Sequence, residues 1–279
     1  MNEISNSQLY RKYKLLQNIL QEMGTIAVAF SGGVDSTLLL KVAWDVLGKN
    51  VLAVTAVSET TPAHEKKQAL SFVQSAEIPH ICIQTEELSD PKFVSNPQDR
   101  CYICKKMRFG KLVSLAKEKG YDRIADGENL DDSSDFRPGR RAVRELGIQS
   151  PLRDVGFGKS DIRELSKELG LSTWNKPAYA CLASRIPYGH KITAEKLRQI
   201  DEGEEYIRQA GLAAQVRVRH EGDTARIEVP EEDIAGFSDP RVRKQVVTHF
   251  KNLGFHFIAL DLEGYRMGSL NQSLRQKII

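Results

Sequence analysis

The sequence predicts an α/β fold, in which a parallel sheet carries helices on both faces, followed by a smaller α+β domain. Segments with helical spacing alternate with short buried runs rich in β-branched residues, and this order is typical of parallel sheets covered by helices. The pattern changes near residue 180, where strictly alternating segments begin. We therefore expect one domain over residues 1–180 and a second over residues 181–279.

The strands of the first domain are short apolar runs bounded by turn residues. The sequences "TIAVAF", "NVLAVTAVS", "HICIQT" and "RIADG" predict strands at 25–30, 50–58, 80–85 and 123–127. A helical stripe of Leu9, Tyr13, Leu16 and Leu20 predicts the first helix. A second helix is expected at 36–48, ending at Gly48. A third should follow Thr61 as its N-cap and Pro62 as its first residue, and a fourth should cover 102–119 and end at Gly120.

The second domain combines long helices with a hairpin. Thr193 is the expected N-cap of the helix "ITAEKLRQIDEGEEYIRQAG". The alternating segment "QVRVRHEGDTARIEVP" predicts a hairpin with its turn at residues 221–223. A helix at about 240–253 and the strand "FHFIALDL" follow. These signals predict an antiparallel sheet.

Composition describes an ordinary globular protein. Of its 279 residues, 41% are apolar and 28% charged, and the net charge is +3. The chain contains no apolar run long enough to span a membrane, and its first residues do not resemble a secretory signal. We therefore expect a cytoplasmic protein without membrane association. The positive net charge gives a weak preference for anionic partners. It is too small to indicate nucleic-acid binding, so nucleic acid is an unlikely partner.

The segment "SGGVDS" is the most informative stretch for function. It comprises Ser31, Gly32, Gly33, Val34, Asp35 and Ser36, and it joins a buried strand to a helix. Two glycines allow a tight turn and a close approach to a ligand, and the free amides at the start of a helix bind phosphate. Asp35 would repel a phosphate, which predicts either a divalent cation there or a catalytic contact with the attacking group. The Walker A spacing is absent, so this is a different phosphate loop.

SGGVDS resembles the PP-loop of the ATP pyrophosphatases, the adenine nucleotide α-hydrolase-like fold. The resemblance implies that ATP is cleaved to AMP and pyrophosphate, with Mg²⁺, and that Ser58 after the second strand contacts the nucleotide. Asp126, Gly127 and Asn129 follow the fourth strand, at the edge where ligands bind in open α/β sheets. We expect them to contact the nucleotide as well.

Several other segments resemble one family within this superfamily, LarE, the ATP-dependent sulfurtransferases of nickel-pincer cofactor synthesis. They are "NKPAYACLASRIPYGHKIT", "DFRPGRRAVRELG", "RVRHEGDTARIEVP" and "LDLEGYRMGSLN". The resemblance implies that a carboxylate of pyridinium-3,5-biscarboxylic acid mononucleotide is adenylylated and that sulfur then replaces AMP. It also implies a homo-oligomer, such as a hexamer. In some members the sulfur comes from a cysteine that ends as dehydroalanine, and the resemblance places that cysteine at Cys181.

Two further cysteines stand in "RCYICKK". Family analogy predicts that Cys101, Cys104 and Cys181 converge on a [4Fe-4S] cluster with an open iron that carries a sulfide. A zinc site and a persulfide-relaying thiol pair remain alternatives. Arg185 and Lys176 are expected to favour the Cys181 thiolate. The fourth cysteine, Cys82, lies between two isoleucines and is expected in the core.

The hairpin offers arginines for an anionic substrate. Arg217 and Arg219 share one face of a strand, and a guanidinium matches phosphate geometry. Solvent-exposed charges on an amphipathic hairpin are the alternative. The family resemblance assigns the substrate to Arg217 and Arg219, and we add Ser184, Arg185 and Glu228. Arg140 and Arg141 are further candidates for pyrophosphate, whereas His190 and His220 are expected in solvated loops.

Three other functions fit parts of the pattern. A tRNA thiolase would share the PP-loop and the cysteines, but the chain shows no added RNA-binding module. An ammonia-using synthetase would not need three cysteines. A nucleotide sensor without catalysis would bind ATP but would not release pyrophosphate in response to the mononucleotide.

Overall fold

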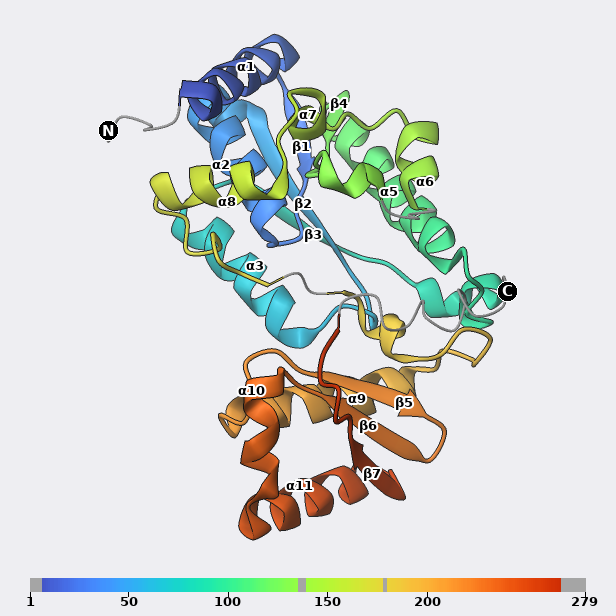
Figure 1. The fold of residues 1–279 in the computed structure, drawn as a ribbon. Helices are drawn as coiled ribbons and strands as arrows, with labels where there is room; N and C mark the ends of the chain where they lie inside the picture. The colour runs from blue at the N-terminus through green and yellow to red at the C-terminus, as the bar shows by residue number, and fades with distance from the viewer. Residues whose placement is uncertain (1–6, 135–138, 178–179, 267–279) are drawn as a thin grey trace. The chain divides into compact units, whose positions relative to one another are not determined.

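The computed structural model describes residues 7–134, 139–177 and 180–266, which form two compact units (Figure 1). The first unit contains the residues up to 58, 64–87 and 99–179. The second contains 59–63, 88–98 and the residues from 180 onward. No helix among the described residues is both long and apolar enough to cross a membrane.

A four-stranded parallel sheet forms the centre of the first unit. Its strands are β1 (Ile26–Ala29), β2 (Val51–Val57), β3 (His80–Gln84) and β4 (Arg123–Ala125), in the order β3-β2-β1-β4. Ile26 pairs with Val51 on one side and with Arg123 on the other. The predicted α/β fold with a parallel sheet is confirmed.

Helices cover both faces of this sheet because neighbouring residues of a strand point to opposite sides. Ile26 and Val28 pack with one group of helices, whereas Ala27 packs with another. The first group consists of α1 (Ser7–Met23), α2 (Val34–Leu47), α3 (Ala63–Ser75) and α8 (Lys159–Glu168), and the second of α5 (Arg100–Glu118) and α6 (Gly139–Glu145). Figure 1 shows α2 and α8 on one side of the strands and α5 and α6 on the other.

The remaining short elements of the chain connect these parts. They are α4 (Pro91–Val94), α7 (Pro151–Asp154) and the 3₁₀ turns η1 (Gly48–Asn50), η2 (Glu87–Ser89), η3 (Asp131–Ser134), η4 (Leu182–Arg185) and η5 (Ala235–Ser238). Gly48 ends α2 at φ 54°, as its sequence position predicts. α3 begins at Ala63, so Pro62 stands just before the helix and not at its first position.

Cys82 corrects one prediction, because its side chain is exposed. It lies on β3, which pairs with β2 and, among the strands that the structure describes, forms one edge of the sheet. Ile81 and Ile83 turn toward the core that contains α5. Cys82 points to the opposite face, and at the edge strand the helices on that face leave it uncovered. The isoleucines on either side of Cys82 therefore indicated a strand, but they did not show that both faces of this strand are buried.

The second unit contains a three-stranded sheet in the order β5-β6-β7. β5 (Arg217–Glu221) and β6 (Thr224–Glu228) form the predicted antiparallel hairpin, but β7 (Phe257–Leu260) runs parallel to β6. The predicted antiparallel sheet is thus wrong for its third strand. The chain between β6 and β7 contains α10 (Glu231–Ile234) and α11 (Pro240–Asn252), and a connection with a helix permits a parallel return.

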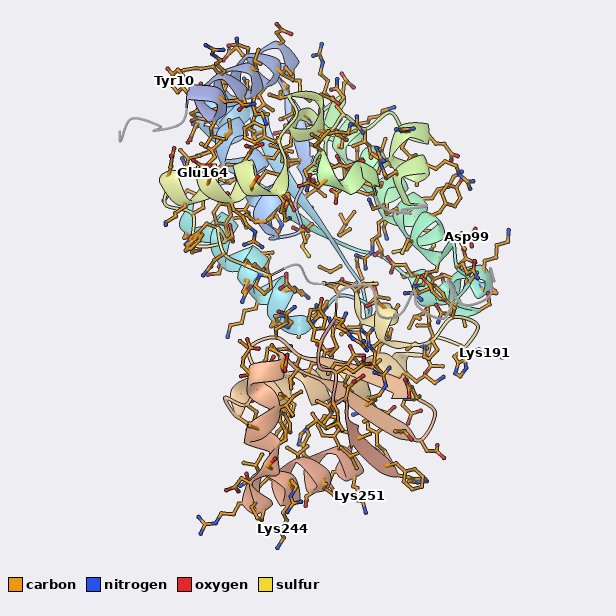
Figure 2. The ribbon with its side chains drawn as sticks, viewed as in Figure 1. Tyr10, Asp99, Glu164, Lys191, Lys244 and Lys251 are labelled. Atoms are coloured by element: carbon orange, nitrogen blue, oxygen red, sulfur yellow. The ribbon has the colours of Figure 1, made fainter. Side chains whose placement is uncertain are left out.

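One face of this sheet packs against helices. Thr193 is the N-cap of α9 (Ala194–Gln209), as predicted, and its side chain accepts a hydrogen bond from the Lys196 amide at 3.2 Å. Val246 and Phe250 of α11 are buried with residues of β5 and β6. Lys244 and Lys251 on the same helix point away from this core (Figure 2).

Candidate active site

The PP-loop joins β1 to α2 and is held closed by its own serines. The Ser36 hydroxyl lies 3.0 Å from the Ser31 hydroxyl and accepts the Ser31 amide at 3.2 Å. Gly32 adopts φ +74°, and a Cβ there would lie 2.8 Å from the Cβ of Ala69. Only glycine satisfies both the backbone and the packing at this position. Gly33 is the N-cap of α2, so the loop delivers the chain to a helix N-terminus.

Asp35 has two partners at the start of α2. The Lys159 ammonium lies 2.6 Å from one oxygen and 2.8 Å from the other, and the Asn129 amide donates at 3.2 Å. The structure thus brings together Asp35 and Asn129, which were both predicted. Lys159 was missed, although a lysine at the first position of a helix opposes the helix dipole and offered a signal.

The residues after β4 lie against the PP-loop. A Cβ on Gly127 would stand 2.8 Å from the Ser36 amide nitrogen, so the two backbones are in close contact. Asp126 is buried and accepts hydrogen bonds from the Ser150 hydroxyl at 2.7 Å and from the Glu128 amide at 3.2 Å. Burial raises the pKa of Asp126.

A cavity of about 180 Å³ opens beside these residues. Its lining consists of Ala29, Ser31, Asp35, Ser36, Lys105, Asp126, Gly127, Glu128, Asp132 and Arg140. Arg140 forms an ion pair with Glu128. Arg141, by contrast, stacks its guanidinium 3.8 Å from the centre of the Tyr102 ring. Of the two predicted pyrophosphate arginines, Arg140 is therefore the one at the cavity.

Lys176 bonds to the PP-loop. Its ammonium donates to the Gly32 carbonyl at 2.9 Å and to Glu65 at 2.9 Å. The ammonium therefore holds the loop carbonyl while a buried carboxylate balances its charge. The prediction that Lys176 favours the Cys181 thiolate stays a prediction; its ammonium contacts the loop carbonyl and the Glu65 carboxylate of α3.

The CxxC motif lies in the first turns of α5, after Asp99, which Figure 2 labels. Cys101 is exposed and Cys104 is half-buried. The Cys104 thiol donates to the Glu87 carboxylate over 3.8 Å, and Glu87 is fully buried. Arg108 forms an ion pair with Glu87 and donates to the Ser58 hydroxyl at 2.7 Å. Ser58, predicted to contact the nucleotide, is thus connected to the CxxC helix.

Glu87 carries its charge in this setting because of Arg108. Burial alone would raise the pKa of Glu87, but the guanidinium outweighs it and holds that pKa below its ordinary value. Neither Glu87 nor Arg108 was predicted as part of a site. The sequence offered only a weak signal, because Glu87 and Arg108 are two charged residues far apart in the chain that the fold brings into contact.

In the second unit Cys181 directly precedes the short turn η4. Arg185 at the end of η4 donates to the carbonyls of Ala180 and Cys181, at 2.5 and 2.9 Å, and to the Ser184 hydroxyl at 3.0 Å. Its other nitrogens bind both oxygens of Glu204, at 2.7 and 2.9 Å. Arg185 is thus enclosed and holds the backbone at Cys181.

Glu204 was missed, although α9 carried a signal. Leu197, Ile200 and Ile207 form its buried stripe, and Glu204 falls on the same face. A carboxylate within an apolar stripe requires a buried cation, and Arg185 supplies it. Burial would raise the pKa of Glu204, but Arg185 dominates and lowers it.

Arg217 and Arg219 are buried, so for these two arginines the alternative of solvated surface charges is wrong. Arg219 binds both oxygens of Glu228, at 2.9 and 2.7 Å, and donates to the Ser184 carbonyl at 2.9 Å. Arg226 reaches Glu228 at 2.7 Å. Arg217 lies 5.1 Å from the centre of the Tyr265 ring. Burial, and then the neighbouring Arg185, lower the pKa of Arg217.

His220 corrects another prediction, because it is buried on β5 and not in a solvated loop. Its Nε2 lies 2.9 Å from the Gln199 side-chain oxygen, and its ring packs 5.1 Å from that of Phe255. Sequence reasoning placed it near the hairpin turn, where the strand in fact continues through it. His190 is exposed, as predicted.

The three predicted cluster cysteines are divided between the units. Cys101 and Cys104 belong to the first and Cys181 to the second. Among residues 7–134, 139–177 and 180–266, no group of three or more histidine, cysteine, aspartate or glutamate side chains is close enough to hold a metal ion. Cys101 and Cys104 are nevertheless three positions apart on one helix, which places both thiols on the same face.

Comparison with known proteins identifies the family. A family model described as NAD synthase matches residues 9–99. The pyridinium-3,5-bisthiocarboxylic acid mononucleotide synthase of Lactiplantibacillus plantarum is 39% identical over 269 residues, which cover 95% of this chain and 96% of that protein. An uncharacterised protein of Synechocystis sp. is 44% identical over 266 residues, 95% of this chain and 99% of that protein.

A third relative, an uncharacterised protein of Methanocaldococcus jannaschii, is 32% identical over 260 residues, 92% of this chain and 98% of that protein. These similarities extend across both units, and the loop geometry agrees with them. The chain therefore belongs to the LarE family of PP-loop proteins and is an ATP-dependent sulfurtransferase.

Proposed function

We propose that this enzyme adenylylates a carboxylate of pyridinium-3,5-biscarboxylic acid mononucleotide and replaces AMP with sulfur to give a thiocarboxylate. The printed name of the Lactiplantibacillus relative supports the product class. The observation that carries the proposal is the serine-closed PP-loop packed on Gly127, because a helix N-terminus behind two glycines suits a leaving pyrophosphate.

The first step needs phosphate ligands and a cation. A carboxylate oxygen attacks the α-phosphorus of ATP, and the bond to pyrophosphate breaks. In this proposal residues 31–36 bind the pyrophosphate, while Ser58, Asp126, Gly127 and Asn129 contact the nucleotide. Asp35 is suited to bind Mg²⁺, because it places a carboxylate at the loop. Lys159 balances the charge of this carboxylate in the structure. Mg²⁺ would supply charge neutralisation at the phosphates.

The second step transfers sulfur. A sulfur nucleophile attacks the acyl carbon of the adenylate, and AMP leaves with the bonding electrons. We propose that Cys101, Cys104 and Cys181 would hold a [4Fe-4S] cluster, which would supply a sulfide as this nucleophile; the shared face of the first two thiols and the family resemblance support this. The alternative is that Cys181 itself donates: its Cβ–S bond breaks, its α-proton is lost, and dehydroalanine remains.

The mononucleotide phosphate is assigned to the buried arginines of the hairpin. Arg219 binds Glu228 and the Ser184 carbonyl, and Arg185 binds Glu204. We expect Arg219, Arg185 and Ser184 to shape the phosphate site around Arg217. Glu228 then orients Arg219. We expect Arg217→Ala to raise KM for the mononucleotide about tenfold or more while leaving KM for ATP nearly unchanged. Equal effects on both would contradict this assignment.

Pyrophosphate release tests the whole proposal. With ATP and Mg²⁺, release should depend on the dicarboxylate mononucleotide and not on tRNA. Release without any acid would indicate simple hydrolysis, and release driven by tRNA would indicate a thiolase. Failure of any acid to stimulate release would leave a nucleotide sensor as the better description.

The sulfur source is tested by iron and by protein mass. Protein purified without oxygen and reconstituted should contain about four irons per chain and lose them in Cys101→Ala. After one turnover its mass should be unchanged. Loss of the mass of H₂S from the Cys181 peptide would establish sacrifice of that cysteine instead. We further propose a homo-oligomer in the cytoplasm, which light scattering and cell fractionation address.

A further inference from the structure

We propose that Lys105, on the helix that carries the CxxC motif, is a ligand of the pyrophosphate at the PP-loop. This inference rests on the proposed ATP site and adds a cation from a different part of the chain. Lys105 lines the cavity together with Ser31, Ser36 and Gly127. It follows the two serines by about seventy residues in the sequence and precedes the glycine by about twenty.

The charges around the cavity single out this lysine. Arg140 is paired with Glu128, and Lys159 with Asp35. Lys105 has neither a hydrogen bond nor an ion pair with any residue that the structure describes; its ammonium lies only over the Phe109 ring, 5.8 Å from the centre. A lysine that faces a phosphate loop without a carboxylate of its own is suited to an incoming anion.

The path of the Lys105 side chain is kept open by a glycine. A Cβ on Gly139 would lie 2.7 Å from Cδ of Lys105 and 3.2 Å from the carbonyl oxygen of Cys101. Gly139 is buried at the start of α6, so the lysine stem passes directly over its backbone. Any larger residue there would displace the stem. Gly139 therefore sets the path of the Lys105 side chain. A substitution at Gly139 changes that path, whereas a substitution at Lys105 removes the charge.

The cavity favours pyrophosphate over a simple carboxylate as the occupant. Its lining includes four acidic side chains, Asp35, Asp126, Glu128 and Asp132, which repel a bare anion. Pyrophosphate reaches such a site with a divalent cation, and its remaining oxygens then need a separate positive group. Lysine binds phosphate as a point charge without a fixed geometry. The charge of Lys105 is also close enough to Asp126 to oppose the rise that burial causes in its pKa.

A consequence concerns the thiols. Cys104 directly precedes Lys105 in α5, so an anion held by Lys105 ties the first turns of this helix to the PP-loop. Pyrophosphate should therefore slow alkylation of Cys104, and this effect should be lost with the lysine.

The test measures binding of inorganic pyrophosphate with Mg²⁺ to the full-length enzyme by calorimetry. Lys105→Ala should weaken binding about 10- to 100-fold, the loss expected for one charge-assisted hydrogen bond. Lys105→Arg should recover most of it. Gly139→Ala should also weaken binding, because it moves the stem without removing the charge. Lys106→Ala is the matched control: that exposed lysine binds Glu145 at 3.0 Å and should leave the affinity unchanged.

Three results would overturn the assignment. If Lys105→Ala binds pyrophosphate as tightly as the wild type, Lys105 is not a ligand, and the proposed function stands unaffected. If the variant keeps its pyrophosphate affinity but loses the dicarboxylate mononucleotide, the lysine binds a carboxylate instead. Wild-type enzyme that binds neither ATP nor pyrophosphate would remove the proposed function together with this inference.

Discussion

Arg185 and Glu204 form an ion pair in which both side chains are 0% exposed. Two buried charges cost desolvation energy, so the pair is weak evidence for stability by itself. What it does provide is geometry: the guanidinium also holds the carbonyls of Ala180 and Cys181. The pair therefore fixes the backbone at the cysteine on which the chemistry is proposed to depend.

Removing one partner should be much worse than removing both. We expect Arg185→Met to lower the free energy of unfolding by about 3–5 kcal/mol, because Glu204 is then left buried without its main counter-charge. Urea denaturation measures this. The double variant Arg185→Met with Glu204→Leu should recover part of the loss, and a double variant as unstable as the single one would show that the charge imbalance is not the cause.

His220 should make stability depend on pH. Burial, followed by the nearby charge of Lys196, lowers the pKa of His220, so the unfolded chain takes up its proton first as pH falls. The stabilisation is present above the ordinary histidine pKa of 6.5 and is lost as pH falls from there through the lowered value. Unfolding free energies at pH 7 and pH 5 should differ less in His220→Gln than in the wild type. His190→Gln, at an exposed position, should keep the wild-type difference.

At the residue scale, sequence revealed the groups that form contiguous motifs. The residues of SGGVDS and of the turn after β4 could be named in advance because each sits at the end of a strand in a recognisable order. Lys105, Lys159, Glu87 and Arg108 were not assigned, because the weak local signals at some of them do not say which distant loop a side chain faces. Glu204 lay between these cases, since its place in an apolar stripe was visible but its partner was not.

Among the elements, the PP-loop depends on glycine in the neighbouring turn. We expect Gly127→Ala to weaken ATP binding about tenfold or more, because a Cβ would stand 2.8 Å from the Ser36 amide nitrogen and displace the loop. Equilibrium binding of ATP measures the effect. Gly110→Ala is the control: a Cβ there meets no atom within 4 Å, and alanine stabilises a helix by about 0.5–1 kcal/mol. Unchanged ATP affinity in Gly127→Ala would mean that the loop does not bind the phosphates in this conformation.

Element types were largely predictable, but the direction of β7 was not. The hydrophobic period identifies a strand, yet it contains no information about which neighbour the strand joins. β7 follows α11, and a helical crossover brings it back beside β6 in parallel. The exposure of Cys82 has a similar cause, because the position of β3 at the sheet edge is set by topology and not by its own residues.

At the scale of the whole molecule, the chain passes more than once between its two units. Residues 59–63 and 88–98 belong to the second unit although they lie between strands of the first. The Leu182 amide donates to the Thr60 carbonyl at 2.9 Å. A single boundary at residue 180 does not include these segments, and sequence periodicity gives no sign of them, because each is short and has no stripe of its own.

Asn96 shows how much the second unit relies on such a segment. It is fully buried at φ 56°, and its side-chain amide donates to the carbonyls of Ile186, Pro187 and His190, at 3.2, 2.8 and 3.1 Å. The segment from 186 to 190 follows η4, so Asn96 braces the chain directly after the turn whose start Arg185 holds.

We expect Asn96→Ala to lower the free energy of unfolding by about 2–4 kcal/mol, since three carbonyls lose the donor of a buried side chain and alanine is strained at positive φ. Asn96→Gly separates the two causes: it relieves the strain but not the lost donor, and should recover about 1 kcal/mol. Hydrogen exchange should show faster opening of residues 182–192 in both variants. If exchange there matches the wild type while global stability falls, Asn96 acts on the unit as a whole and does not brace the cysteine segment.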